Sequence, residues 1–161
     1  MADLPGVAAD AGEVLATLRR RSLWLGSVES LTGGMFAEEV TAVPGASKAF
    51  VGGFVTYASR LKHDLVGVDR GLIERLGVVN ADTAEAMARG GRERLGADLV
   101  VACTGAAGPE PQDGQQPGTV FIAVAHDRGV DVRRLSLSGD RQAVRRQTVA
   151  AMLGLVAEAL A

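Results

Sequence analysis

The stretch "DLVVACTG", residues 98–105, is a nearly continuous apolar run in the middle of the chain. A strand without alternation of polar and apolar residues is expected to be covered on both faces of a sheet. Helix-like and strand-like segments alternate along the chain on both sides of it, and two further strands surround the turn "DRG" at 127–129 as in a hairpin. This order predicts an α/β sandwich built on a mixed sheet.

Periodicity and turn residues divide the chain into the remaining elements. Apolar residues on one face predict a helix over 7–20, which includes Val7, Ala11, Val14, Leu15 and Leu18. Further helices are expected from Thr32 to before Pro44, over 80–96 with Asn80 or Asp82 as its cap, and from Arg141 to Leu160, with short helical pieces between 59 and 77. Strands are expected over 23–28, 48–58, 98–105, 118–127 and 130–138.

Composition limits the classes of function. A chain of 161 residues is expected to form one domain, 1–161, with residues 1–6 loosely held. The net charge of −2 does not favour a nucleic-acid surface, and no apolar run reaches the roughly 18 residues of a membrane span. The single cysteine, Cys103, and the lack of a signal-peptide pattern predict a cytoplasmic protein. His63 and His126 show no metal-ligand spacing, so no metal is expected.

The segment "SVESLTGGMFAEEV", 27–40, runs from a strand into a helix. Glu29 and Ser30 would lie at the strand end, and Thr32, Gly33 and Gly34 at the helix start, where free N–H groups attract negative charge. The pattern suits a phosphate cradle or a nucleophile loop. It suits equally well a plain N-cap by Ser30 or Thr32. The Walker A and GxGxxG patterns are absent, which weakens nucleoside-triphosphate and dinucleotide readings.

Three other segments carry candidate site residues. Tyr57 and Lys62 lie where a strand gives way to a helix, although a lone lysine is more often solvated and a lone tyrosine more often fills a core edge. A long polar loop follows the buried strand, at the place where α/β sheets usually bind ligands, unless it is only a flexible connection. The candidate substrate-binding residues at the end of this strand and the start of the loop are Thr104, Gly105 and Gly108. Arg141 and Arg145 share a face of the last helix and could bind a phosphate, or form an exposed, salt-bridged helix start.

Five segments, in this order and spacing, resemble the CinA C-terminal domain family, the nicotinamide-nucleotide amidases: "ESLTGG" (29–34), "GGFVTYASRLK" (52–62), "TGAAGP" (104–109), "GTVFIAVA" (118–125) and "SGDRQAVRRQT" (138–148). The resemblance covers roughly residues 10–160. It implies a three-layer α/β/α sandwich with a mixed, mostly parallel sheet. It also implies hydrolysis of nicotinamide mononucleotide to nicotinic acid mononucleotide and ammonia, a salvage step of NAD metabolism, with no cofactor.

The same resemblance implies the roles of individual residues. Ser30 matches the nucleophile, Lys62 the lysine that activates it and Tyr57 a nearby tyrosine, whereas Thr104 and Arg145 match further active-site positions, with Arg141 kept as a candidate. Leu31 stands where the family often has cysteine, and the loop "EPQDGQQPGTV", 110–120, is one residue shorter than the common form and lacks its lysine. These departures leave phosphate contacts and substrate preference open.

A different class of function remains an alternative. The family is also named for competence and DNA damage, and the same loops could bind a nucleotide or a partner without turnover. A small-molecule nucleotide is the expected substrate of the amidase, with neither nucleic acid nor membrane as a partner. The possibility of a homo-oligomer stays open.

Overall fold

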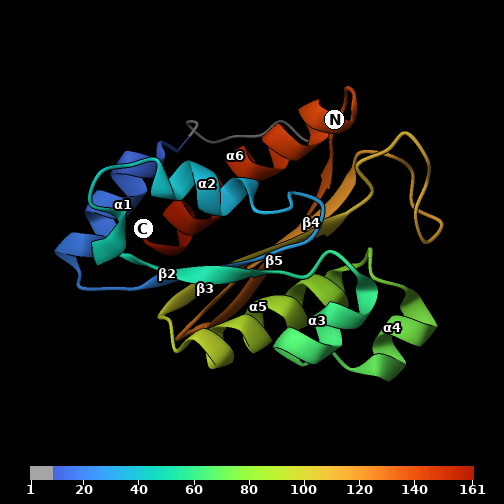
Figure 1. Ribbon diagram of the computed structural model, residues 1–161, viewed down its shortest axis with the longest axis horizontal. Helices are drawn as coiled ribbons and strands as arrows, with labels where there is room; N and C mark the ends of the chain where they lie inside the picture. The colour runs from blue at the N-terminus through green and yellow to red at the C-terminus, as the bar shows by residue number, and fades with distance from the viewer. Residues whose placement is uncertain (1–8) are drawn as a thin grey trace.

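The computed structural model describes residues 9–161, and it shows an alternation of helices and strands (Figure 1). The helices are α1 (Ala11–Arg20), α2 (Met35–Thr41), α3 (Ser59–Val66), α4 (Arg70–Leu76), α5 (Ala81–Leu95) and α6 (Arg141–Ala159), with a short 3-10 turn, η1 (Ala46–Lys48). The strands are β1 (Leu25–Glu29), β2 (Phe50–Val55), β3 (Leu99–Gly105), β4 (Thr119–His126) and β5 (Gly129–Ser136). The expectations for Val7 and for a loose segment 1–6 lie outside the described residues.

The five strands form one mixed sheet in the order β2-β1-β3-β4-β5. β1 pairs in parallel with both β2 and β3, whereas β4 is antiparallel to β3 and to β5. The carboxyl ends of β1, β2 and β3 therefore meet at one edge of the sheet, the edge where α/β proteins usually place their ligands. The start of β4 and the end of β5 lie at the same edge, because these strands form the predicted hairpin.

Helices cover both faces of this sheet, so the predicted three-layer α/β/α sandwich is confirmed (Figure 1). α1, α2 and α6 pack on one face, and α3, α4 and α5 lie on the other. Successive side chains of the apolar run in β3 point to opposite faces of the sheet, and both faces are buried. Val101 and Cys103 belong to the core beneath α6, and Val100 and Ala102 to the core beneath α5. This is why the run shows no alternation of polarity. Cys103 is fully buried, as its position in the run predicts.

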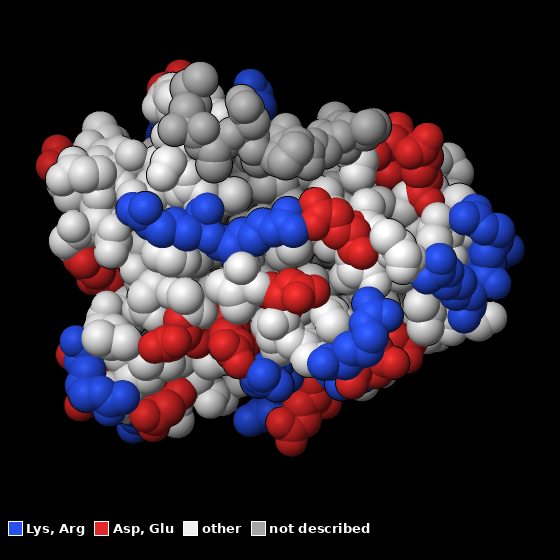
Figure 2. Space-filling model, turned by 180° about the vertical axis from the view of Figure 1, so that it is seen from behind, with Lys and Arg blue, Asp and Glu red and all other residues white. Residues whose placement is uncertain are grey.

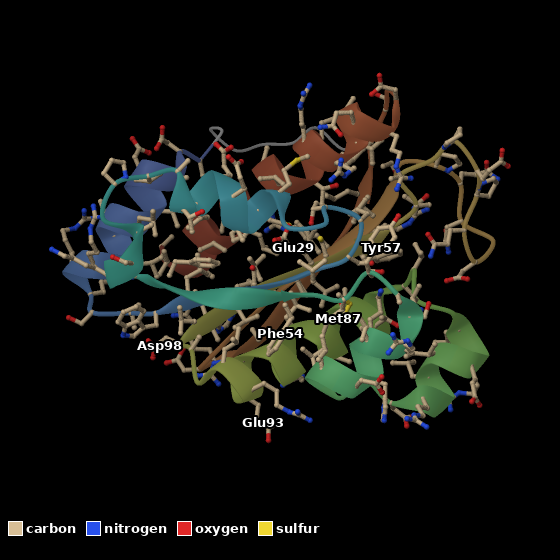
Figure 3. All side chains as sticks on the ribbon, viewed as in Figure 1. Glu29, Phe54, Tyr57, Met87, Glu93 and Asp98 are labelled. Atoms are coloured by element: carbon tan, nitrogen blue, oxygen red, sulfur yellow. The ribbon has the colours of Figure 1, made fainter. Side chains whose placement is uncertain are left out.

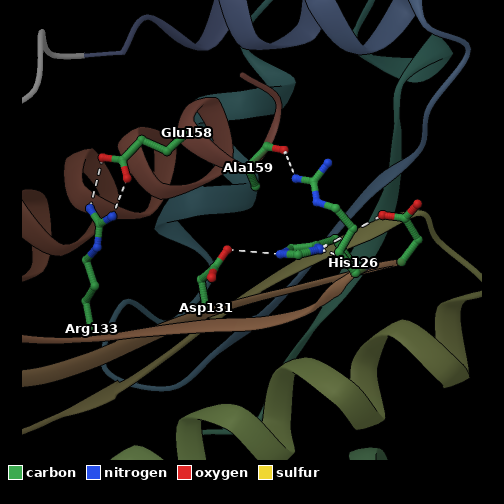
Figure 4. Close-up of polar contacts among 7 residues, drawn as sticks. His126, Asp131, Arg133, Glu158 and Ala159 are labelled. Carbon is green, nitrogen blue, oxygen red and sulfur yellow. Dashed lines mark hydrogen bonds and ion pairs between the residues drawn. The ribbon is translucent and has the colours of Figure 1, made fainter.

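Polar contacts fasten α6 to the hairpin at the edge of the sheet far from the strand carboxyl ends (Figure 4). Arg133 of β5 holds the carboxylate of Glu158 with both terminal nitrogens, and this hydrogen bond keeps the pKa of Glu158 below its usual value. Arg128 in the hairpin turn donates to the carbonyl of Ala159 at 2.8 Å. α6 runs for 19 residues, so its first turn reaches the opposite edge of the sheet.

The surface carries both signs of charge. On the face drawn in Figure 2, acidic and basic side chains are interspersed, and one row of basic side chains ends against acidic ones. Within residues 9–161, no helix combines the length and the hydrophobicity that crossing a bilayer requires.

Candidate active site

Ser30 and Lys62 meet at the carboxyl edge of the sheet. Ser30 directly follows β1, and Lys62 lies in the first turn of α3, which begins just after β2. The Nζ atom of Lys62 is 2.9 Å from the Oγ atom of Ser30 and 2.7 Å from the carbonyl oxygen of Thr56. The lysine is completely buried, and Ser30 is 8% exposed. The alternative of a solvated surface lysine is therefore wrong for Lys62.

Burial lowers the pKa of Lys62 from 10.5 to about 8, because an ammonium group loses its hydration in the interior. Interactions with Cys103 and Asp113 act in the opposite direction. The pKa of Cys103 is itself raised to about 11 by burial, so its thiol is neutral where Lys62 titrates. A lysine with a pKa near 8 is neutral in about one molecule in ten at pH 7. Its lone pair can then accept the hydroxyl proton of Ser30.

The carboxylate of Glu29 forms hydrogen bonds with the start of α2. It accepts hydrogen bonds from the hydroxyl of Thr32 at 2.6 Å and from the backbone N–H groups of Phe36 and Ala37 at 2.8 and 3.2 Å. Figure 3 shows Glu29 between β1 and α2. The two N–H groups belong to the first turn of α2, where a negative charge is favoured. By its place in the 27–40 segment Glu29 is a candidate for binding substrate, and its carboxylate is engaged within the fold.

The expectation that α2 begins at Thr32, and the alternative that Thr32 or Ser30 caps it, are both wrong. The residue preceding the helix is Gly34, which has no side chain to cap it. Thr32 instead donates to Glu29, and Glu29 supplies the acceptor that a capping side chain normally provides. A residue from the end of β1 therefore replaces a local cap.

The loop between β1 and α2 presents free backbone donors. Gly33 and Gly34 have φ of +58° and +105°, which favours glycine at both positions. The Ser30 N–H donates to the Cys103 carbonyl and the Gly33 N–H to the Ser30 carbonyl. Within residues 9–161, the N–H groups of Leu31, Thr32 and Gly34 have no hydrogen-bond partner. They are the donors that remain available to a ligand.

Arg145 fixes the conformation of that loop. Its Nε atom donates to the Leu31 carbonyl at 2.9 Å, and its two terminal nitrogens donate to the Thr32 carbonyl and to the side chain of Gln142. Since the C=O and N–H of one trans peptide point in opposite directions, the bond to Leu31 turns the Thr32 N–H away from the arginine. All three guanidinium nitrogens are thus engaged within the protein.

Arg141 lies one turn earlier on the same helix and is more exposed. It donates to the carbonyl of Gly108 at 2.8 Å and to the hydroxyl of Tyr57 at 3.0 Å. Tyr57 is 60% exposed, so the alternative that it fills a core edge is wrong. Figure 3 shows Tyr57 at the same edge of the sheet as Glu29. Arg141 and Tyr57 form an exposed pair at the rim of the site.

Thr104 is buried at the end of β3, and its hydroxyl donates to the carbonyl of Val78 at 2.6 Å. Gly105 is the last residue of β3, and Gly108 begins the long loop that Arg141 holds. All predicted site residues therefore gather at one edge of the sheet, although the contacts of Glu29, Thr104 and Arg145 are internal to the protein. Their catalytic and binding roles remain predictions.

Two contributors to the site were not predicted. The carbonyl of Thr56 orients Lys62, and a backbone atom leaves no signature in the sequence. Asp113 lies on the long loop and exerts a charge effect on Lys62. The Asp113-Gly114 pair is a known signal of a two-residue hairpin turn, so the turn could have been found, but not the effect of Asp113 on Lys62.

Comparison with known proteins identifies the family. A sequence model of the CinA C-terminal domain matches residues 8–160. A CinA-like protein of Frankia casuarinae is 47% identical over 150 residues, which are 93% of this chain and 35% of that protein. A CinA-like protein of Geotalea daltonii is 43% identical over 153 residues, 91% of this chain and 37% of that protein. The chain thus spans about a third of the length of these curated relatives.

Solved structures match over nearly their whole length. A CinA superfamily protein from Klebsiella pneumoniae superposes with a TM-score of 0.90 at 28% identity, covering 93% of this chain and 94% of that one. The competence/damage inducible protein CihA from Agrobacterium tumefaciens gives a TM-score of 0.85 at 31% identity, with 99% of both chains covered.

Proposed function

Since this chain belongs to the CinA C-terminal domain family, we propose that it hydrolyses the carboxamide of nicotinamide mononucleotide to nicotinic acid mononucleotide and ammonia. The observation that carries the proposal is the buried contact of 2.9 Å between Lys62 Nζ and Ser30 Oγ. An amide is a poor electrophile, so a serine that attacks it needs a base. A lysine held in the interior at a pKa of about 8 meets this need near neutral pH.

In the first half of the reaction, neutral Lys62 accepts the hydroxyl proton of Ser30 while Oγ bonds to the carboxamide carbon. One Lys62 N–H continues to donate to the Thr56 carbonyl, which keeps the lone pair directed at the serine. The carboxamide oxygen becomes an oxyanion, and the free N–H groups of Thr32 and Gly34 are the donors proposed to stabilise it. Lys62 then gives its proton to the departing nitrogen. The C–N bond breaks and ammonia leaves.

In the second half, water hydrolyses the acyl-enzyme. Lys62 accepts a proton from the attacking water, whose oxygen bonds to the acyl carbon. The bond to Ser30 Oγ breaks, and the proton returns from Lys62 to that oxygen. The product is a carboxylic acid, which ionises to the carboxylate by releasing its remaining proton to solvent, and Ser30 and Lys62 are back in their starting states.

Of the two arginines, Arg141 is the better candidate for the 5′-phosphate. Arg145 uses all three guanidinium nitrogens on Leu31, Thr32 and Gln142. Arg141 is exposed, and its bonds to Tyr57 and Gly108 leave Nε without a partner within the described residues. A guanidinium group can hold a phosphate with two parallel hydrogen bonds.

The decisive test measures ammonia and nicotinic acid mononucleotide from purified protein and nicotinamide mononucleotide. Ser30→Ala is expected to abolish turnover to within background, and near-normal ammonia release from this variant would overturn the nucleophile assignment. Ser59→Ala is the matched control, because Ser59 is an exposed serine at the start of α3. Tight binding of the nucleotide by the wild type without any product would favour the silent binding module instead.

A second comparison tests the phosphate contact. Arg141→Ala is expected to raise KM for nicotinamide mononucleotide by about tenfold or more, since a charged hydrogen bond is lost. It should leave the turnover of nicotinamide riboside, which lacks the phosphate, nearly unchanged. An equal loss on both substrates would show that Arg141 acts on something other than the phosphate.

A further inference from the structure

The long loop between β3 and β4 is tied down at three places. At its start, Arg141 holds the carbonyl of Gly108. At its end, the Gly118 N–H donates to the Ala106 carbonyl, and the Gly118 carbonyl accepts the Leu137 N–H. At its tip, Gln112 and Gln115 pair through two backbone hydrogen bonds of 3.0 and 2.8 Å. The alternative of an ordinary flexible connection does not fit a loop with these contacts.

The tip is a two-residue hairpin turn formed by Asp113 and Gly114. Their φ values are +48° and +75°, the positive values that a turn of this kind needs. Aspartate tolerates this conformation better than most residues. The turn presents the Asp113 side chain to the connection between α4 and α5.

The Asp113 carboxylate reaches a buried backbone donor there. Its Oδ2 atom accepts the N–H of Val78 at 2.7 Å, and Val78 is only 3% exposed. Without Asp113 this N–H would be a buried donor with no partner within the described residues, which is costly. On the other side of the same residue, the Val78 carbonyl accepts the hydroxyl of Thr104. Asp113 and Thr104 therefore hold Val78 from both sides.

Gly77 shows how closely the loop approaches. A Cβ atom at this position would lie 2.5 Å from Cγ of Asp113, and φ is +70°. Both observations favour glycine, because a side chain would push the carboxylate away from Val78. The contact thus depends on residues of two separate segments, Asp113 on the long loop and Gly77 before Val78.

We propose that Asp113 is a positioning residue that fastens the 108–118 loop to Gly77 and Val78, and that its negative charge acts on the buried amine of Lys62. The proposal rests on the proposed amidase function for its catalytic meaning. The groups with a charge interaction on Lys62 are Cys103 from β3 and Asp113 from the loop. The thiol of Cys103 is neutral at the pH where Lys62 titrates, which leaves the interaction with the Asp113 carboxylate.

The Asp113 carboxylate therefore limits how far burial lowers the pKa of Lys62. Burial favours the neutral amine, whereas the Asp113 charge favours the protonated form. Lys62 needs both states in turn, because it accepts the serine proton and then gives a proton to the leaving nitrogen. Asp113 would adjust the balance between these two steps without touching the substrate.

Two variants separate the charge from the hydrogen bond. Asp113→Asn keeps an oxygen that can accept the Val78 N–H but loses the charge, whereas Asp113→Ala loses both. Glu110→Gln is the matched control, because it removes one charge from an exposed position on the same loop. If the alanine variant does not fold, the asparagine variant still tests the charge.

The titration of Lys62 can be followed by NMR on protein labelled at lysine Cε. The chain has only two lysines, and the exposed Lys48 serves as an internal reference. The Lys62 midpoint is expected near pH 8 in the wild type, lower in Asp113→Asn, and unchanged in Glu110→Gln. An identical midpoint in the wild type and in Asp113→Asn overturns the charge role.

The fastening is read from hydrogen exchange at the Val78 amide. Exchange should be about three- to tenfold faster in Asp113→Ala and close to wild type in Asp113→Asn, since one hydrogen bond is lost only in the former. Equal protection in all three proteins overturns the fastening role.

The pH dependence of ammonia release from nicotinamide mononucleotide tests the effect of Asp113 on catalysis. The acid limb of the pH profile should move to lower pH in Asp113→Asn and stay in place in Glu110→Gln. The NMR and exchange measurements need no substrate. An inactive wild type would thus refute the amidase proposal, while these measurements would still decide the role of Asp113.

Discussion

The titration of Lys62 makes a quantitative prediction about the pH dependence of the proposed reaction. With a pKa of 10.5, only about one lysine in 3,000 is neutral at pH 7, whereas with a pKa of about 8 about one in ten is neutral. Burial therefore raises the concentration of active base about 300-fold at this pH. The value of kcat/KM should rise about tenfold per pH unit below pH 8 and level off above it.

The assay is ammonia release from nicotinamide mononucleotide between about pH 6 and about pH 9.5, with buffers matched in ionic strength. Lys62→Arg keeps a positive charge but cannot become neutral, since a guanidinium group stays protonated in proteins. It should lose activity as completely as Ser30→Ala, and Lys62→Met should do the same without any charge. A flat profile, or a Lys62→Met variant with substantial activity, would refute the general-base role.

The same pKa shift affects stability in a defined direction. The pKa of Lys62 is lower in the folded protein than in the unfolded chain, so the unfolded chain binds more protons between about pH 8 and pH 10.5. The free energy of unfolding should therefore rise with pH across this window, by up to about 3 kcal/mol relative to Lys62→Met. Chemical denaturation of both proteins at several pH values measures the difference. A difference that does not change with pH would contradict the lowered pKa.

Other contacts yield further predictions. Glu29→Gln should lower the free energy of unfolding by about 2 kcal/mol in urea, because the start of α2 loses its carboxylate, whereas the exposed Glu38→Gln should change it little. Arg145→Met should lower kcat about 10- to 100-fold by releasing the nucleophile loop. The same change at its exposed neighbour Arg146 should be nearly silent, and equal effects would contradict the loop-fixing role. The pKa of Cys103 is raised from 9.0 to about 11, so the folded protein binds more protons in this window and stability should fall as pH rises through it. Cys103→Ala should remove that loss, and an unchanged pH dependence in this variant would count against it.

Much of the fold could be predicted because it depends on local patterns. Alternating segments and the apolar run of β3 predicted the sandwich, and Asn80 caps α5 as expected, with its side chain accepting the Thr83 N–H at 2.8 Å. The start of α2 could not be found in this way. Its first N–H groups are satisfied by Glu29, which precedes them by seven or eight residues and belongs to a strand.

For the candidate site too, some features could be predicted from local sequence patterns and others depended on the tertiary structure. Ordered motifs in the sequence identified the candidate residues, because Ser30 and Lys62 lie in segments that resemble motifs of the family. Only the tertiary structure decided what each neighbour contacts, since Arg145 reaches a carbonyl 114 positions away and Asp113 meets an N–H 35 positions away. Hydrogen bonds and charge effects depend on distance in space and on burial, and parallel strands bring distant segments to one edge of the sheet. The sequence thus determined the chemical groups of this protein, and folding decided which of them are free to react.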